Sequence, residues 1–137
     1  MSTDKELVHN MDQITWKYVK PLHDFQAVRN FLRQQKCSLP EGLIECLEKN
    51  NGGRPSIKLF DTNVSCGYVF KALLSYNEDD LENIYMVYPT MFQSKMIYPI
   101  GTDSAGNFIC YNLAHGNYIL WKHETNKEEA IILSPAP

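Results

Sequence analysis

The sequence predicts an α+β fold: a single domain of N-terminal helices packed on one face of a mainly antiparallel sheet, with a C-terminal β-meander. Three observations lead to this prediction. Apolar residues recur at helical spacing in the first half of the chain. From residue 96 onward, four short apolar stretches follow at intervals of about ten residues, separated by turn residues. The length of 137 residues suits one domain, which we place at residues 1–137.

Two helices are expected in the first half. The first covers residues 24–36, with Asp24 as its N-cap. Its apolar stripe consists of Phe25, Val28, Phe31 and Leu32. The second begins near Pro40, because proline suits the first helical turn, and stops at residues 50–53, where Asn and Gly tolerate the left-handed conformation of a C-cap.

A third, shorter helix is expected to open at Asn77, which would cap it ahead of acidic residues in the first turn. Its apolar positions are Leu81, Ile84, Tyr85 and Tyr88. Pro89 should end or kink this helix, because proline lacks the backbone N–H.

Strands are expected before and within the meander, at residues 57–60, 67–74, 96–101, 108–113, 118–122 and 130–133. Between the first two strands of the meander, residues 103–107 form a turn. Asp103 is expected to accept hydrogen bonds from its own backbone there, as aspartate commonly does in turns.

Composition excludes several classes of protein. Thirteen Lys and Arg against sixteen Asp and Glu give a net charge of −3, whereas a nucleic-acid-binding protein needs a clustered basic excess. The longest apolar runs span about five residues, far below the roughly 20 that cross a bilayer. The N-terminus has neither the basic flank nor the apolar stretch of a signal peptide. We therefore expect a cytoplasmic protein that binds neither nucleic acid nor membranes directly.

The residue spacing does not match common catalytic or cofactor sites. The four cysteines, Cys37, Cys46, Cys66 and Cys110, lack the close pairing of a zinc or redox site, and there is no phosphate-binding loop. His115 and His123 could face each other across a hairpin, but no third ligand is evident. A nucleophilic Cys110 or Cys66 beside a histidine is the enzymatic alternative. We expect no cofactor, no metal and no catalysis.

An ordered series of short motifs covers about residues 14–125. In chain order they are Trp16-Lys17-Tyr18-Val19; Leu39-Pro40 at a helix start; Asn50-Asn51-Gly52-Gly53-Arg54-Pro55; Phe60; Leu73-Leu74-Ser75; Tyr98-Pro99-Ile100; Asp103 with Gly106-Asn107-Phe108-Ile109-Cys110; and Trp121-Lys122-His123-Glu124. This series resembles the SUKH superfamily, which includes a fungal cell-wall synthesis regulator and bacterial immunity proteins.

The resemblance implies a non-catalytic α+β domain. Bacterial members are typically immunity proteins, which bind and block a polymorphic toxin in the cytosol of the cell that makes it; many of these toxins are nucleases. The resemblance also implies a further helix after the last strand. Here residues 131–133 run directly into a Ser-Pro-Ala-Pro end, so we expect that helix to be lost or replaced.

The leading hypothesis is therefore an immunity protein that occludes a cognate toxin, and we expect it to be a monomer. Against a basic nuclease groove, acidic side chains would mimic phosphates and speed association. The candidate partner-binding residues are Asp79, Asp80, Glu82, His123, Glu124, Glu128 and, by charge, Glu129. The alternative is a regulatory or scaffolding adaptor that binds an endogenous protein.

Overall fold

The computed structural model describes residues 14–132. Its elements, in chain order, are β1 (Trp16–Lys17), α2 (Ala27–Gln35), α3 (Glu41–Lys49), β2 (Arg54–Pro55), β3 (Leu59–Thr62), β4 (Tyr68–Leu73), α4 (Ile84–Met91), β5 (Ile97–Asp103), β6 (Phe108–Asn112), β7 (Tyr118–Lys122) and β8 (Lys127–Ile132). The predicted α+β class is confirmed. Residues 1–13 of the predicted domain, the last residue of the expected 130–133 strand and the expected loss of a C-terminal helix lie outside the described residues.

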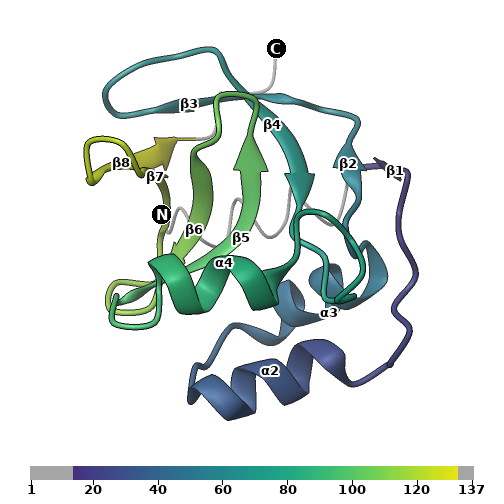
Figure 1. Cartoon of the computed structure of the whole chain (residues 1–137). Helices are drawn as coiled ribbons and strands as arrows, with labels where there is room; N and C mark the ends of the chain where they lie inside the picture. The colour runs from purple at the N-terminus through teal and green to yellow at the C-terminus, as the bar shows by residue number, and fades with distance from the viewer. Residues whose placement is uncertain (1–13, 133–137) are drawn as a thin grey trace.

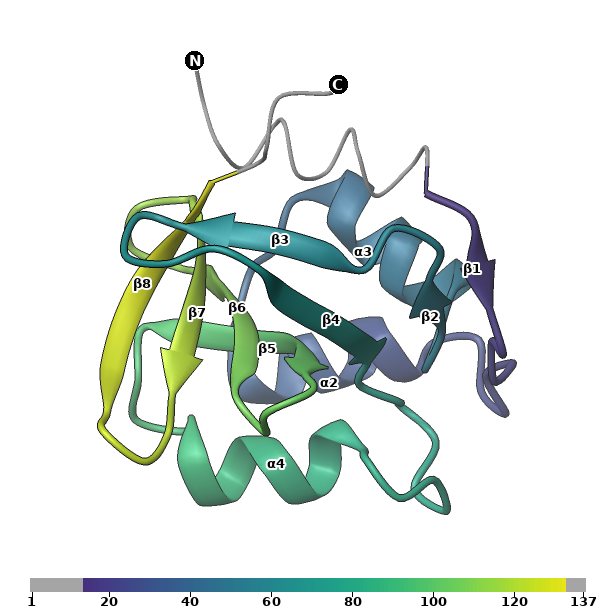
Figure 2. The same ribbon diagram turned by 90° about the horizontal axis from the view of Figure 1, so that it is seen from above.

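Antiparallel pairing joins the strands from β3 to β8 in chain order, and the predicted C-terminal meander is β5 to β8. The sheet also closes on itself, which the sequence did not indicate. β3 pairs with β4 through its first two residues and with β8 through Asp61 and Thr62. Figure 2 shows β3 crossing above the other strands toward β8. The result is a closed barrel, beside which β1 and β2 form a separate two-stranded ladder.

The helices gather at one end of the strands. In Figure 1, α2 and α3 lie below the sheet and α4 crosses in front of the lower part of β5 and β6. Phe31 of α2 joins these layers, because its ring packs edge-on against Tyr85 and Tyr88 of α4, both at 5.5 Å, and against Tyr98 of β5 at 6.5 Å. This aromatic cluster fixes α2 relative to α4 and the sheet.

The first helix begins later than predicted. Asp24 forms a turn instead, in which its side chain accepts a hydrogen bond from the N–H of Gln26 and its carbonyl accepts one from the N–H of Ala27. The helix therefore starts at Ala27, with Val28, Phe31 and Leu32 on its buried face. Phe25 stands outside the helix, and its exposed fraction is 88%, so its expected place in the buried stripe was wrong.

The third helix also begins later. Its N-cap is Asn83, whose side chain accepts a hydrogen bond from the N–H of Met86. Asn77 has another role: its amide donates to the carbonyl of Pro21 and accepts from the N–H of His23. Pro89 lies inside α4, which continues to Met91. The predicted cap at Asn77 was therefore wrong, and Asn83, six positions downstream, caps the helix instead.

The second helix follows the prediction, with Pro40 at its N-cap and its last residue at Lys49. Gly52 has a φ of +66°, the left-handed conformation expected after a helix end. A Cβ on Gly53 would lie 2.9 Å from the carbonyl oxygen of Asn50, so the chain reverses too tightly there for a side chain.

The turn between β5 and β6 also follows the prediction. One carboxylate oxygen of Asp103 accepts hydrogen bonds from the N–H groups of Ala105 and Asn107, and the other accepts one from the Asn107 amide. Gly106 supplies the positive φ of +84°. The two tryptophans of the motif series pack on aromatic rings, Trp16 against Phe70 and Trp121 against Phe92.

Candidate partner-binding surface

Buried amide side chains position the loop between β4 and α4. Asn51 is fully buried; its amide donates to the carbonyl of Lys20 and the hydroxyl of Ser75, and it accepts from the N–H of Tyr76. Asp80 accepts a hydrogen bond from the same hydroxyl. These bonds connect the end of α3, Lys20 and the loop.

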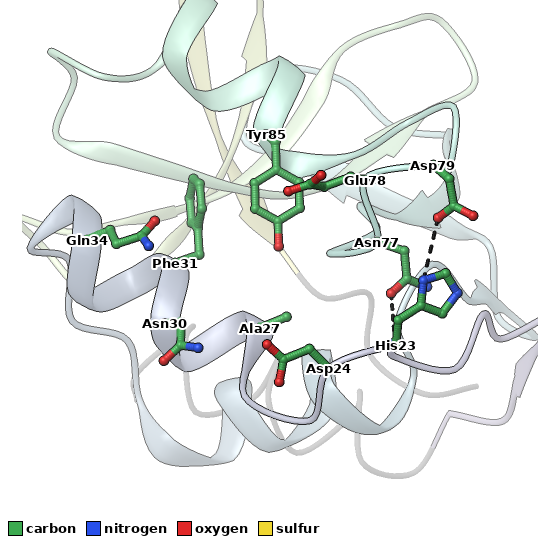
Figure 3. A pocket seen from close by; sticks show the side chains of 10 residues that line it. All are labelled: His23, Asp24, Ala27, Asn30, Phe31, Gln34, Asn77, Glu78, Asp79 and Tyr85. Atoms are coloured by element: carbon green, nitrogen blue, oxygen red, sulfur yellow. Dashed lines mark hydrogen bonds and ion pairs between the residues drawn. The ribbon is translucent and has the colours of Figure 1, made fainter.

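A groove of about 570 Å³ lies between α2 and this loop. We call it the acidic groove; its lining residues are His23, Asp24, Ala27, Asn30, Phe31, Gln34, Asn77, Glu78, Asp79 and Tyr85. Figure 3 shows the His23 ring turned toward Asp79, with Nδ1 3.7 Å from the carboxylate. Across residues 14–132, the carboxylates of Asp24, Glu78 and Asp79 form no ion pair with lysine or arginine. Their negative charge is therefore available to a partner.

Two aromatic rings form the inner wall of the acidic groove. Phe31 and Tyr85 meet edge-to-face, and the Tyr85 hydroxyl donates to the carbonyl of Tyr76. Burial and the nearby carboxylates of Glu78 and Asp24 raise the pKa of Tyr85, so this hydroxyl stays protonated at neutral pH. An aromatic wall beneath carboxylates suits the side chain of a lysine or arginine, which combines an apolar stem with a charged end.

A second groove, of about 540 Å³, lies on the other side of the turn that precedes α2. We call it the apolar groove; it is lined by Val19, Pro21, Leu22 and Phe25, with Glu45, Glu48 and Lys49 from α3. Asp24 lines the acidic groove and the next residue, Phe25, lines the apolar groove. The two grooves are therefore adjacent.

Comparison with known proteins gives one match. The family model of the SMI1/KNR4 family (SUKH-1) matches residues 23–135. The chain belongs to the SUKH-1 family. The resemblance predicted from the motif series is thereby confirmed. No curated protein and no solved structure matches the chain. SUKH proteins are generally non-catalytic proteins of immunity or regulation, and a protein partner is the kind of ligand that membership indicates.

Of the candidate residues predicted in the loop of this SUKH-1 protein, Asp79 lies in the acidic groove. Asp80 is turned inward to Ser75, and Glu82 forms an ion pair with Lys71 at 2.7 Å. Of these three residues, Asp79 is thus the one whose carboxylate lines the acidic groove and forms no ion pair with a lysine.

The other candidates, His123, Glu124 and Glu128, are exposed and belong to the hairpin between β7 and β8. Both views place this hairpin beyond one end of α4 and the β4–α4 loop beyond the other (Figures 1 and 2). The candidate residues of this SUKH-1 protein therefore lie on two separate surfaces. Glu129 belongs to neither, because it is buried.

Sequence reasoning missed Glu78 and Phe25 as surface residues, and it assigned Asp24 to a cap. The acidic groove joins residues 23–34 to residues 77–85, so no local spacing could reveal it. The one available signal was the set of consecutive acids at 78–80, which was interpreted mainly as the first turn of a helix.

The described part of this SUKH-1 protein shows no metal site and no membrane-spanning helix. Within residues 14–132, no three His, Cys, Asp or Glu side chains are grouped closely enough to hold a metal ion. No helix in the same range has the length and apolar character needed to cross a membrane. His115 precedes β7 and His123 follows it, so the two lie at opposite ends of one strand and do not face each other.

The cysteines differ in their surroundings. Cys46 and Cys110 are buried, and burial raises the pKa of the Cys110 thiol, which disfavours the nucleophilic thiolate. Cys37 is half-buried and its sulfur lies 3.4 Å from the Tyr88 hydroxyl. Cys66 is exposed. The proposed Cys110 nucleophile thus sits in an environment that suppresses its reactivity.

Proposed function

We propose that this SUKH-1 protein is a cytoplasmic immunity protein that neutralises a toxin protein by stoichiometric binding. The observation that carries the proposal is the acidic groove, in which Asp24, Glu78 and Asp79 face solvent without a lysine or arginine partner in the described part of the chain. Family membership supports a protein ligand, because immunity and regulation by binding are the roles that it indicates.

A nuclease toxin fits this groove best. Its substrate surface must be basic to hold phosphates, so the carboxylates of the acidic groove would take the place of the nucleic acid backbone. Such charge complementarity raises the association rate, which matters for a protein that must capture its toxin before damage occurs. Neutralisation would then arise from blocking access to substrate.

The test uses the toxin domain encoded by the gene next to that of this chain. We expect growth arrest when the toxin domain is expressed alone, and growth when the two proteins are expressed together. The purified pair should elute as a 1:1 complex in size-exclusion chromatography, and its nuclease activity should fall in proportion to the immunity protein added.

Absence of both growth rescue and a complex would overturn the proposal and favour the adaptor function. A complex that leaves nuclease activity unchanged would also overturn it, because occlusion is the mechanism proposed. The control is a catalytically inactive toxin domain, which should arrest nothing but still bind.

A further inference from the structure

We propose that the acidic and apolar grooves form one docking surface, centred on Phe25, for a protein partner that presents an apolar side chain beside lysine or arginine. The proposed function supplies the partner used in the first test, and this inference adds where and through which chemistry the partner binds.

The exposure of Phe25 is the first observation. Its ring stands almost wholly in water, and it lines the apolar groove together with Val19, Pro21 and Leu22. Tyr18, three quarters exposed, precedes Val19 in the chain. Large exposed apolar side chains beside an apolar concavity are typical of a surface that a partner covers. Aromatic side chains, phenylalanine included, are also enriched at the core of protein interfaces.

The rigidity of the segment that carries Phe25 is the second observation. The N–H of Lys20 donates to the carbonyl of Asn51, whose side chain donates back to the carbonyl of Lys20, both at 2.8 Å. The Asn77 amide then holds Pro21 and His23 at 2.9 and 3.0 Å. A backbone fixed in this way loses little conformational entropy on binding, and it holds Phe25 at the boundary of the two grooves.

The charges identify the occupant. On the acidic-groove side, the carboxylates of Asp24, Glu78 and Asp79 can pair with a positive charge of the partner. On the other side, Glu48 is already paired with Arg29 at 3.0 Å, and the two remaining charged residues of the apolar groove, Glu45 and Lys49, have opposite signs. A fitting partner therefore places an apolar side chain in the apolar groove and a lysine or arginine in the acidic groove, against the ring of Tyr85.

The first test uses biolayer interferometry to measure how tightly this protein binds the toxin domain that it neutralises. Phe25→Ala should raise Kd at least about tenfold through faster dissociation, as hot-spot truncations do. The matched control is Val64→Ala, an exposed apolar residue in the β3–β4 connection, which should change Kd less than about twofold. Both positions are exposed, and melting temperatures equal to that of the unsubstituted protein would show that neither substitution affects folding.

The charge arm compares two double variants. Glu78→Gln with Asp79→Asn should slow association about tenfold at low salt and flatten its salt dependence. Glu124→Gln with Glu128→Gln on the β7–β8 hairpin removes the same charge elsewhere and should leave association unchanged. Weaker binding by the hairpin variant, with normal binding by the groove and Phe25 variants, would overturn the docking surface and leave neutralisation intact.

If this protein does not neutralise the toxin domain, the proposed function fails. Binding of a peptide probe then tests whether the docking surface exists. The probes are Ac-Lys-Arg-Leu-Lys-Arg-amide, its Leu→Ser form and its all-glutamate form, added to ¹⁵N-labelled protein. The first should shift the amide signals of residues 19–25 and 77–79 more than the other two. An equal response to all three peptides, or shifts confined to other residues, would overturn the docking surface.

Discussion

The ammonium nitrogen of Lys122 lies 2.9 Å from a carboxylate oxygen of Glu129, whose side chain is only 7% exposed. The second oxygen of Glu129 accepts hydrogen bonds from the hydroxyls of Thr62 and Tyr68, at 2.7 and 2.8 Å. The four side chains come from β7, β8, β3 and β4, so this Glu129 cluster spans the place where the barrel closes.

Because of the Glu129 cluster, we expect the free energy of unfolding to fall in acid. Burial favours the neutral acid, but hydrogen bonds from Lys122, Thr62 and Tyr68 outweigh it and lower the pKa of Glu129. Because the folded-state pKa lies below the unfolded value, near 4.3, ionised Glu129 stabilises the fold above that pH. This stability is lost as the pH falls through the folded-state pKa.

The measurement is urea unfolding between pH 7 and pH 3. Glu129→Gln should lower the free energy of unfolding at pH 7 by about 2 kcal/mol and weaken its dependence on pH below about 5. Glu124→Gln, in the exposed turn, should leave both unchanged. An unaltered pH dependence in Glu129→Gln would contradict the role assigned to this carboxylate.

Asn51→Ala should destabilise the protein by about 3 kcal/mol, because it leaves the Lys20 carbonyl and the Tyr76 N–H without the Asn51 side chain in a buried site. Chemical denaturation measures this loss. The control is Asn30→Ala, on α2 beside the acidic groove, where the side chain accepts one exposed hydrogen bond from Arg33. Equal stabilities of the two variants would show that the Asn51 bonds contribute nothing.

Gly101→Ala should also destabilise the fold, by about 2 kcal/mol, through overpacking. A Cβ at this position would lie 2.8 Å from the Ala72 carbonyl oxygen and 3.0 Å from the Phe70 ring, where β4 and β5 pair through an irregular register. In Gly67→Ala the new Cβ meets nothing within 4 Å, and the cost comes from the φ of +81° alone. If steric overlap of the new Cβ destabilises Gly101→Ala, the melting temperature of Gly101→Ala should be lower than that of Gly67→Ala.

Thiol reactivity should separate the cysteines. Cys66 should react rapidly with Ellman's reagent in the native protein, whereas Cys46 and Cys110 should react only on unfolding, because they are buried. Cys66→Ser should abolish the fast phase. Rapid labelling of Cys110 in native protein would contradict its burial and would revive the nucleophile hypothesis.

How far the sequence predicts this fold depends on whether the deciding contacts are local. The strand at 118–122 and the Asp103 turn were predicted correctly, because alternating apolar runs and turn residues act over a few positions. The start of α4 was wrong, because Asn77 and Asn83 are equally good caps by residue type. Contacts of Asn77 with Pro21 and His23, more than 50 residues away, decided between them.

The candidate site likewise depends on contacts between distant parts of the chain. Asp79 could be selected by charge, but the pairing of Glu82 with Lys71 and of Asp80 with Ser75 depends on the folded loop. Phe25 carried the helical spacing of a buried residue, and the turn at Asp24 removed it from the helix face. Such surface features arise from where elements begin and meet, which the periodicity of one element does not record.

Closure of the barrel also restricts how a partner can bind. Each strand from β3 to β8 pairs with a strand on both sides, so the barrel offers no full-length open edge along which an extended peptide could add as a further strand. The closing pair, β3 with β8, is formed by two residues of each strand. Side chains must then provide most of the recognition on the barrel, because most of its strand backbone is already paired. Substitutions in the loops and turns could therefore redirect partner choice without disturbing the barrel that supports them.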